Sequence, residues 1–121
     1  MTAKKKPSPA LTGNVRELID GYIATDPAFR EALIHEAVEA MLSGDVETGK
    51  TILRDYIKAT DGFEKLGHAI GTPAKSLIRM FGPRGNPQAR NLFGVIGYLQ
   101  KRDGLTLRVV AGKKRPLRRA A

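Results

Sequence analysis

The stretch GFEKLGHAIGTPAKSLIRMFGPRGNP, residues Gly62 to Pro87, predicts two short helices joined by a tight turn. In the first, over residues 63–70, apolar side chains recur on one face at i, i+3 and i+7 spacing. Gly67 stands where two crossing helices would come closest. Gly71 is expected to end this helix, because glycine adopts the left-handed backbone conformation at little cost. Thr72 is then expected to cap the second helix, with a proline in its first turn.

The second helix, predicted over residues 73–81, has an apolar side and a basic side. The side chains predicted to face the interior are Leu77, Met80 and Phe81. Those predicted to face outward are Lys75, Ser76 and Arg79. A glycine turn followed by a short helix with a basic outer face is typical of units that lay a helix in the DNA major groove. The alternative is an ordinary helical hairpin whose basic side chains only interact with solvent.

Charge is distributed unevenly along the 121 residues, whose formal net charge is +9. The two ends, residues 1–12 and 111–121, carry three and five basic side chains and no acidic ones. Residues 62–102 carry seven basic side chains and one acidic side chain, Glu64. This half therefore has the positive charge that DNA binding requires. Residues 13–61 instead hold ten acidic and five basic side chains, which indicates either a solvated helical face or a surface for a basic partner.

The rest of the pattern predicts an all-α helical bundle. Further helices are expected at about 14–24, 27–42, 46–59 and 86–101, with Asp26-Pro27 and Asn86-Pro87 as start signals. The first of these should bury Val15, Leu18, Ile19, Tyr22 and Ile23, and the last should bury Leu92, Phe93, Val95, Ile96 and Leu99. Leu105 to Val110 alternates β-prone residues and predicts one short C-terminal strand, which would pair with a second copy or a partner's sheet, or else remain an extended tail.

The predicted domain organisation follows from charge and periodicity. Residues 1–12 form a disordered basic tail, and residues 13–61 form acidic N-terminal helices. Residues 62–110 hold the two-helix motif, packed with the preceding helices as one domain. Residues 111–121 form a second disordered basic tail.

The segment GDVETGKT, Gly44 to Thr51, matches the nucleotide-binding pattern GxxxxGK[ST] letter for letter. That loop must leave a buried strand so that its amides converge on phosphates. Here the preceding residues have helical periodicity, and Asp45 and Glu47 would bring negative charge towards a polyanion. We interpret the segment as a helix break followed by a helix start.

Other chemistry has little support. The absence of cysteine excludes disulfides and thiolate metal sites. His35 and His68 have no acidic or histidine partner at ligand spacing, and the serines have no local base, so we expect no enzyme activity, cofactor or metal. No segment approaches the ~20 consecutive apolar residues of a membrane span, and the first residues lack an apolar signal region. We expect a cytoplasmic, nucleoid-associated protein.

The span from about Asp26 to Val110 resembles bacterial addiction-module antidote (antitoxin) regulators with a lambda-repressor/Cro-type helix-turn-helix. The resemblance rests on LSGDVETGKTILRDYIKAT before the motif and on KSLIRMFGPRGNPQARNLFGVIGYL through and beyond it. This family usually has alanine where Gly67 stands and an aliphatic residue where Thr72 stands. The resemblance implies a homodimer that represses its own operon and binds a small, basic, ribonuclease-like toxin.

Carried over residue by residue, the family's DNA contacts fall on two groups. The major-groove group is Thr72, Ala74, Lys75, Ser76 and Arg79. The phosphate-binding group is Arg84, Asn86, Gln88 and Arg90. Lys75 or Arg79 would donate to guanine O6 and N7, and the phosphate group would combine charge with free backbone amides.

Two other functions remain open from the sequence. One is a protein-interaction module that neutralises a partner and uses the helix-turn-helix only as a scaffold. The other is a non-specific nucleic-acid-binding protein, including an RNA-binding protein that relies on its basic tails.

Overall fold

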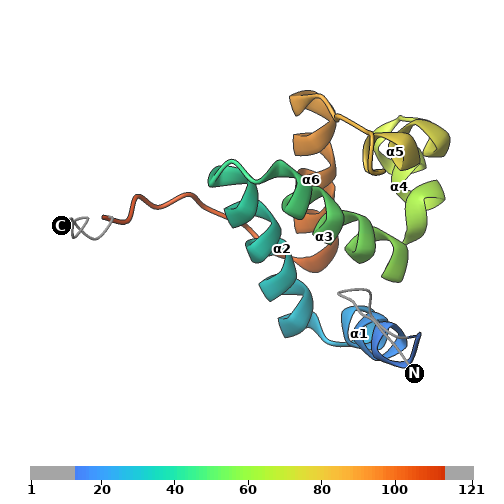
Figure 1. Cartoon of the computed structure of the whole chain (residues 1–121), viewed down its shortest axis with the longest axis horizontal. Coiled ribbons are helices and arrows are strands. Elements are labelled where there is room, and N and C mark those ends of the chain that lie inside the picture. Colours follow the sequence, from blue (N-terminus) through green and yellow to red (C-terminus); the bar gives the residue numbers. More distant parts are fainter. Residues whose placement is uncertain (1–12, 114–121) are drawn as a thin grey trace, which may run out of the picture.

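The computed structural model describes residues 13–113, which form six α-helices and no strand (Figure 1). The helices are α1 (Gly13–Thr25), α2 (Pro27–Leu42), α3 (Val46–Ala59), α4 (Gly62–Ile70), α5 (Ala74–Met80) and α6 (Ala89–Asp103). The predicted all-α class is confirmed. Of the tails predicted over residues 1–12 and 111–121, only residues 111–113 lie within the described part of the chain, where they are exposed and outside any helix. No helix within residues 13–113 is long and apolar enough to cross a membrane.

Two aspartates start the second and third helices. The carboxylate of Asp26 accepts hydrogen bonds from the amides of Ala28 and Phe29 at 3.0 and 3.3 Å. Asp45 begins α3 in a similar way, because it accepts a 3.2 Å bond from the amide of Thr48 and a 2.6 Å bond from its hydroxyl. These bonds satisfy first-turn amides that have no partner inside the helix. The bounds predicted for α2 and α3 are confirmed.

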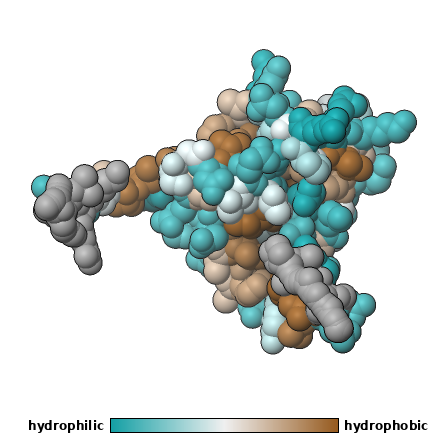
Figure 2. Space-filling model, in the orientation of Figure 1, coloured by the Kyte–Doolittle hydropathy of each residue, from teal (hydrophilic) through white to brown (hydrophobic). Residues whose placement is uncertain are grey.

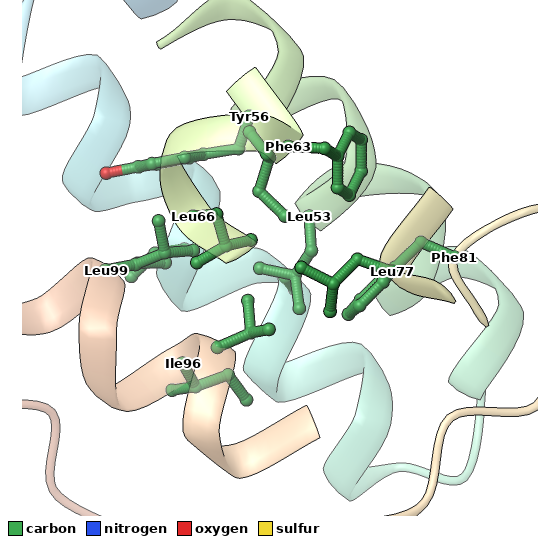
Figure 3. Packing of buried hydrophobic residues seen from close by; sticks show 12 residues of the cluster. Leu53, Tyr56, Phe63, Leu66, Leu77, Phe81, Ile96 and Leu99 are labelled. Atoms are coloured by element: carbon green, nitrogen blue, oxygen red, sulfur yellow. The ribbon is translucent and has the colours of Figure 1, made fainter. Parts of the chain in front are cut away.

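Helix α3 is central, since it packs against α1, α2 and α4. Its side chains Leu53, Tyr56 and Ile57 are buried in one hydrophobic cluster. The other fully or nearly buried members come from α2, α4, α5, the residue directly after α5, and α6: Ile34, Ala37, Phe63, Leu66, Leu77, Phe81, Val95, Ile96 and Leu99. Figure 3 shows side chains from α3 to α6 meeting around Leu53 and Leu66. This shared core fixes α4 and α5 to the rest of the bundle.

Helix α1 is more peripheral than the sequence predicts. Of its five predicted inward residues only Ile23 is buried, whereas Val15, Leu18 and Tyr22 are exposed. The reason is that α1 packs along the edge of the bundle, mainly against α2 and α3. A 3.0 Å ion pair between Arg16 and Asp55 helps to hold it there, and the pKa of Arg16 is raised by that hydrogen bond and charge.

The C-terminal part also departs from the prediction. Phe93 does not face the core, because 66% of it is exposed on α6. The short strand predicted over residues 105–110 is absent from the described chain, and the segment runs extended instead. A helical bundle offers it no sheet to join. Leu105 and Leu107 pack against the core, while the valines that follow are exposed.

Candidate nucleic-acid interface

The corner between α4 and α5 is built on two glycines. Gly71 ends α4 with φ +74°, the left-handed conformation predicted for it. Its amide and that of Thr72 donate to the carbonyl oxygen of Gly67, at 2.8 and 3.0 Å. A Cβ on Gly67 would lie 2.5 Å from the carbonyl oxygen of Thr72 and 3.3 Å from the nitrogen of Ala74. The backbone at Gly67 therefore does lie close to another segment, which is the turn at Thr72 and the first residue of α5.

The start of α5 corrects the predicted cap. Pro73 is the N-cap residue, with φ −57° and ψ 140°, and no side chain caps the helix. The carbonyl oxygen of Pro73 accepts the first bond, from the amide of Leu77 at 3.1 Å. Thr72 is thus one residue too early to act as the cap. The pattern of a capping residue followed by a first-turn proline, which holds at Asp26-Pro27, therefore does not hold at Thr72-Pro73.

Helix α5 has two different sides. Leu77 is fully buried, and so is Phe81 directly after the helix, where its ring centroid lies 6.3 Å from that of Phe63. On the other side Lys75 and Arg79 are exposed and make no ion pair with any residue of 13–113. These two cationic side chains are available to a ligand outside the bundle.

The segment between α5 and α6 packs tightly against the end of α5. A Cβ on Gly85 would lie 2.1 Å from the carbonyl oxygens of both Arg79 and Met80, so only glycine fits there. The carbonyl oxygen of Gly85 accepts a 2.7 Å bond from the Lys50 ammonium. Arg84, immediately before Gly85, is exposed. The position of Arg84 relative to α5 is therefore set by packed backbone.

Asn86 does not cap α6 as predicted. The helix begins at Ala89, with Gln88 as its N-cap residue and no side-chain cap. The carbonyl oxygen of Gln88 accepts the first bond, from the amide of Leu92 at 2.9 Å. The helix start is therefore two to three residues later than Asn86-Pro87 predicts. Gly104 ends the helix in the left-handed conformation, as a glycine C-cap should.

The residues predicted to contact DNA fall into distinct environments. Lys75, Arg79, Arg84 and Arg90 are exposed cations with no ion pair inside residues 13–113; we call them the free-cation group. Asn86 and Gln88 are exposed, whereas Thr72, Ala74 and Ser76 are half-buried. Figure 2 shows hydrophilic side chains projecting at the end of the molecule formed by α4, α5 and the start of α6. These cations can bind a polyanion without first losing an ion pair to another residue of 13–113.

Of the three other cations in residues 62–102, Lys65 and Arg102 form ion pairs, whereas Lys101 is exposed and forms none within residues 13–113. Arg102 donates to Asp61 at 2.9 Å and to Asp103 at 2.7 Å, and Tyr98 donates to Asp61 at 2.5 Å. Burial acts to raise the pKa of Asp61, but the bonds from Tyr98 and Arg102, with the nearby positive charges, outweigh it and lower that pKa below 3.8. The same bond raises the pKa of Tyr98. This network joins the start of α4 to the end of α6.

The segment resembling a nucleotide-binding loop takes the form of a helix break and a helix start, as interpreted from the sequence. Gly44 lies in a turn with φ +96°, and the residues from 46 onward are the first turns of α3. Lys50 is buried and directed to the carbonyl of Gly85, so its ammonium does not face an open loop. This role of Lys50 was not predicted from the sequence. Within residues 13–113 no three His, Cys, Asp or Glu side chains gather as metal ligands do.

No protein-family model, curated protein or solved structure matches this chain. The geometry itself defines a helical corner with a buried apolar side and an exposed cationic side, followed by one exposed cation between α5 and α6 and another in the first turn of α6. Such a surface is suited to a negatively charged, extended ligand.

Proposed function

We propose that this chain is a sequence-specific DNA-binding transcriptional repressor that places α5 in the major groove. The observation that carries the proposal is the division of α5: Leu77 is buried in the core, while Lys75 and Arg79 are exposed and unpaired within residues 13–113. A helix fixed by its apolar side offers its other side at a constant orientation. Arginine and lysine then donate to guanine O6 and N7, the commonest base-specific contact.

The segment after α5 supplies phosphate contacts in this proposal. Arg84 and Arg90 are exposed on either side of the start of α6. Phosphate contacts fix the register of a protein on the duplex without reading sequence. The packing of Gly85 against the end of α5 supports this role, because it holds the phosphate-binding residues at a fixed place relative to the base-reading ones.

The resemblance to antidote regulators refines the proposal: the chain would act as a homodimer that represses its own operon and neutralises a small basic toxin. A second candidate function, a partner-neutralising interaction module, is favoured by one specific surface. Leu18 and Tyr22 are exposed on α1, on a helix that also carries the exposed Glu17. Exposed apolar side chains beside acidic ones fit a basic protein partner.

Selection of bound sequences from a random duplex pool tests the repressor function. The expected result is an enriched inverted repeat with half-sites about 34 Å apart, one helical turn, for a two-fold dimer. Enrichment of no sequence, with equally tight binding of all duplexes, would contradict sequence-specific repression and favour non-specific nucleic-acid binding. Copurification of a basic protein through α1, lost in Leu18→Asp, would favour the interaction module; no such partner would contradict it.

A further inference from the structure

An apolar groove lies on the bundle away from the free-cation group. It has a volume of about 430 Å³ and lies between α2, α6 and the extended C-terminal segment. Val38 and Leu42 of α2 and Phe93 and Ile96 of α6 line it, together with residues 107–110. No residue of α4 or α5 lines the groove. A macromolecule bound there would leave α5 accessible.

Large apolar side chains at this groove are exposed in the single chain. Leu42 and Phe93 are about two thirds exposed, and Val109 and Val110 are 77% and 82% exposed. Figure 2 shows hydrophobic residues continuing along the C-terminal segment as it leads away from the bundle. Exposed apolar side chains gathered at one place mark interaction surfaces more often than the same residues scattered singly.

The C-terminal segment also has unused backbone hydrogen bonds. The amides of Leu105 and Leu107 donate to the backbone and side-chain oxygens of Gln100, at 2.8 and 2.7 Å. Beyond Leu107, up to residue 113, the backbone makes no hydrogen bond to the described part of the chain. An extended segment with adjacent valines and with open amides and carbonyls is a template for pairing with another strand.

The charges at the groove identify the occupant. Glu39 on α2 lines one side and lies 3.8 Å from His35, its only ion-pairing neighbour within residues 13–113; the expectation that His35 has no acidic partner was wrong. Arg108 on the C-terminal segment lines the other, and it makes no ion pair there. The groove thus carries one acceptor and one donor of opposite charge, beside an apolar centre. A surface that holds both complementary halves is what a two-fold contact between identical chains requires.

We infer that a second copy of this chain occupies the groove. Residues 107–110 of each copy lie along the groove of the other, where Val109 and Val110 cover Leu42 and Phe93, and Arg108 pairs with Glu39. The two extended segments run antiparallel beside each other and share backbone hydrogen bonds. The inferred dimer rests on the proposed function in one respect, because a repressor that binds an inverted repeat needs two copies. The interface leaves both α5 helices uncovered.

Sedimentation equilibrium of the full chain and of single variants tests the inference. The wild type is expected to be a dimer, and Val109→Asp and Phe93→Asp are expected to weaken dimerisation by tenfold or more, since each puts a charge in the apolar centre. Leu18→Asp is the matched control, because Leu18 is 58% exposed on α1, outside the groove, and should leave the dimer intact. Circular dichroism of each variant checks that the helices are retained.

Charge exchange provides a second, independent measurement. Arg108→Glu and Glu39→Arg should each weaken dimerisation roughly tenfold, because each places like charges opposite one another. The double variant Arg108→Glu/Glu39→Arg should recover most of that loss. Recovery would not occur if the two side chains acted only as solubilising charges.

Three results would overturn the inference. One is a wild type that stays monomeric, including the case in which the chain's own residues 114–121 fill the groove. Another is a dimer unaffected by Val109→Asp and Phe93→Asp. The last is a double charge variant no better than the singles. Failure of the DNA function is distinguishable, because duplex selection would then enrich nothing while dimerisation through the groove persists. Conversely, an enriched site bound by monomers would retain the DNA function and remove this interface.

Discussion

The ammonium of Lys50 in α3 donates to the carbonyl oxygen of Gly85, 2.7 Å away and 35 positions later in the chain. The Lys50 side chain is only 2% exposed, a rare position for lysine unless it is paired. Its other partner, Glu47, lies 3.1 Å away but is 70% exposed. Of the two interactions of the Lys50 ammonium, the hydrogen bond to Gly85 is therefore the more buried. This bond connects α3 to the segment that carries Arg84.

Replacing Lys50 by methionine should lower the free energy of unfolding by about 1–3 kcal/mol, because the carbonyl of Gly85 would lose its donor in a partly buried place. Glu47→Gln is the matched control. It removes the negative charge of a carboxylate that is 70% exposed, leaves an amide oxygen that can accept from Lys50, and should cost about 1 kcal/mol. Urea unfolding of both variants measures the difference. Equal losses would show that the Glu47 pair, and not the Gly85 bond, is what Lys50 contributes.

Two glycine-to-alanine substitutions should act in opposite directions. Gly85→Ala should destabilise the fold by about 1–3 kcal/mol or more, since its Cβ would lie 2.1 Å from two backbone oxygens at the end of α5. Gly21→Ala lies inside α1 with nothing within 4 Å, and should stabilise by about 0.5–1 kcal/mol through helix propensity. Thermal or urea unfolding measures both. A neutral Gly85→Ala would mean that the segment can move away from α5.

Local signals predicted the helices well where they act within a few residues. Asp26-Pro27 and Gly71 fix a helix start and a helix end through hydrogen bonds and backbone conformation that depend on adjacent residues only. The caps proposed at Thr72 and Asn86 were wrong, because the N-cap residues of α5 and α6 are Pro73 and Gln88, one and two positions later. Periodicity thus predicted the helices, whereas a polar residue followed by proline located the N-cap correctly only at Asp26.

Tertiary features were less predictable. Leu18 and Phe93 fit the apolar stripes of their helices, yet both are exposed because no other element of the described chain covers those faces. The burial of Lys50 depends on a carbonyl 35 positions away, and no local pattern reports it. For the candidate site, the sequence predicted the exposure of Lys75 and Arg79 through the α5 periodicity, but not the packing that holds Arg84 in place.

Acid should weaken the fold through Asp61. The pKa of Asp61 is lowered in the folded chain, so its stabilising effect is complete above the unfolded value of about 3.9 and is lost as pH falls through the folded value. Asp61→Asn should therefore be less stable than the wild type near neutral pH, and the gap should narrow as the pH falls below about 5. Urea unfolding across that range measures it, and a constant gap would contradict the role of the charge.

Tyr98→Phe separates the hydrogen bond from the ion pair in the same network. The variant removes the donor that lies 2.5 Å from Asp61 and leaves Arg102 in place. The pKa of Asp61 should rise relative to the wild type, because its charged form loses one hydrogen bond. NMR titration of the Asp61 carboxyl measures the change. An unchanged pKa would assign the lowering to Arg102 and Lys65 alone.

Arg79→Ala tests base reading directly. Discrimination between the selected operator and random duplex should fall by about 1–3 kcal/mol, because a guanidinium on α5 would no longer donate to a guanine edge. Lys101→Ala, an exposed cation at the far end of α6, should leave discrimination unchanged. Binding is measured on both duplexes at one salt concentration. An equal loss on the two duplexes would show that Arg79 contacts only the phosphate backbone.

Removing the basic ends should affect affinity and not sequence preference. Residues 1–12 and 111–121 carry eight basic side chains and no acidic ones, so their deletion removes attraction that does not depend on sequence. Overall affinity should fall and its dependence on salt should become shallower, since fewer counterions are released from the DNA. Residues 105–110 remain in this variant, so dimerisation through the groove should persist. Titrations on operator and random duplex at several salt concentrations measure the slopes. A preference lost with the ends would mean that they, and not α5, read the bases.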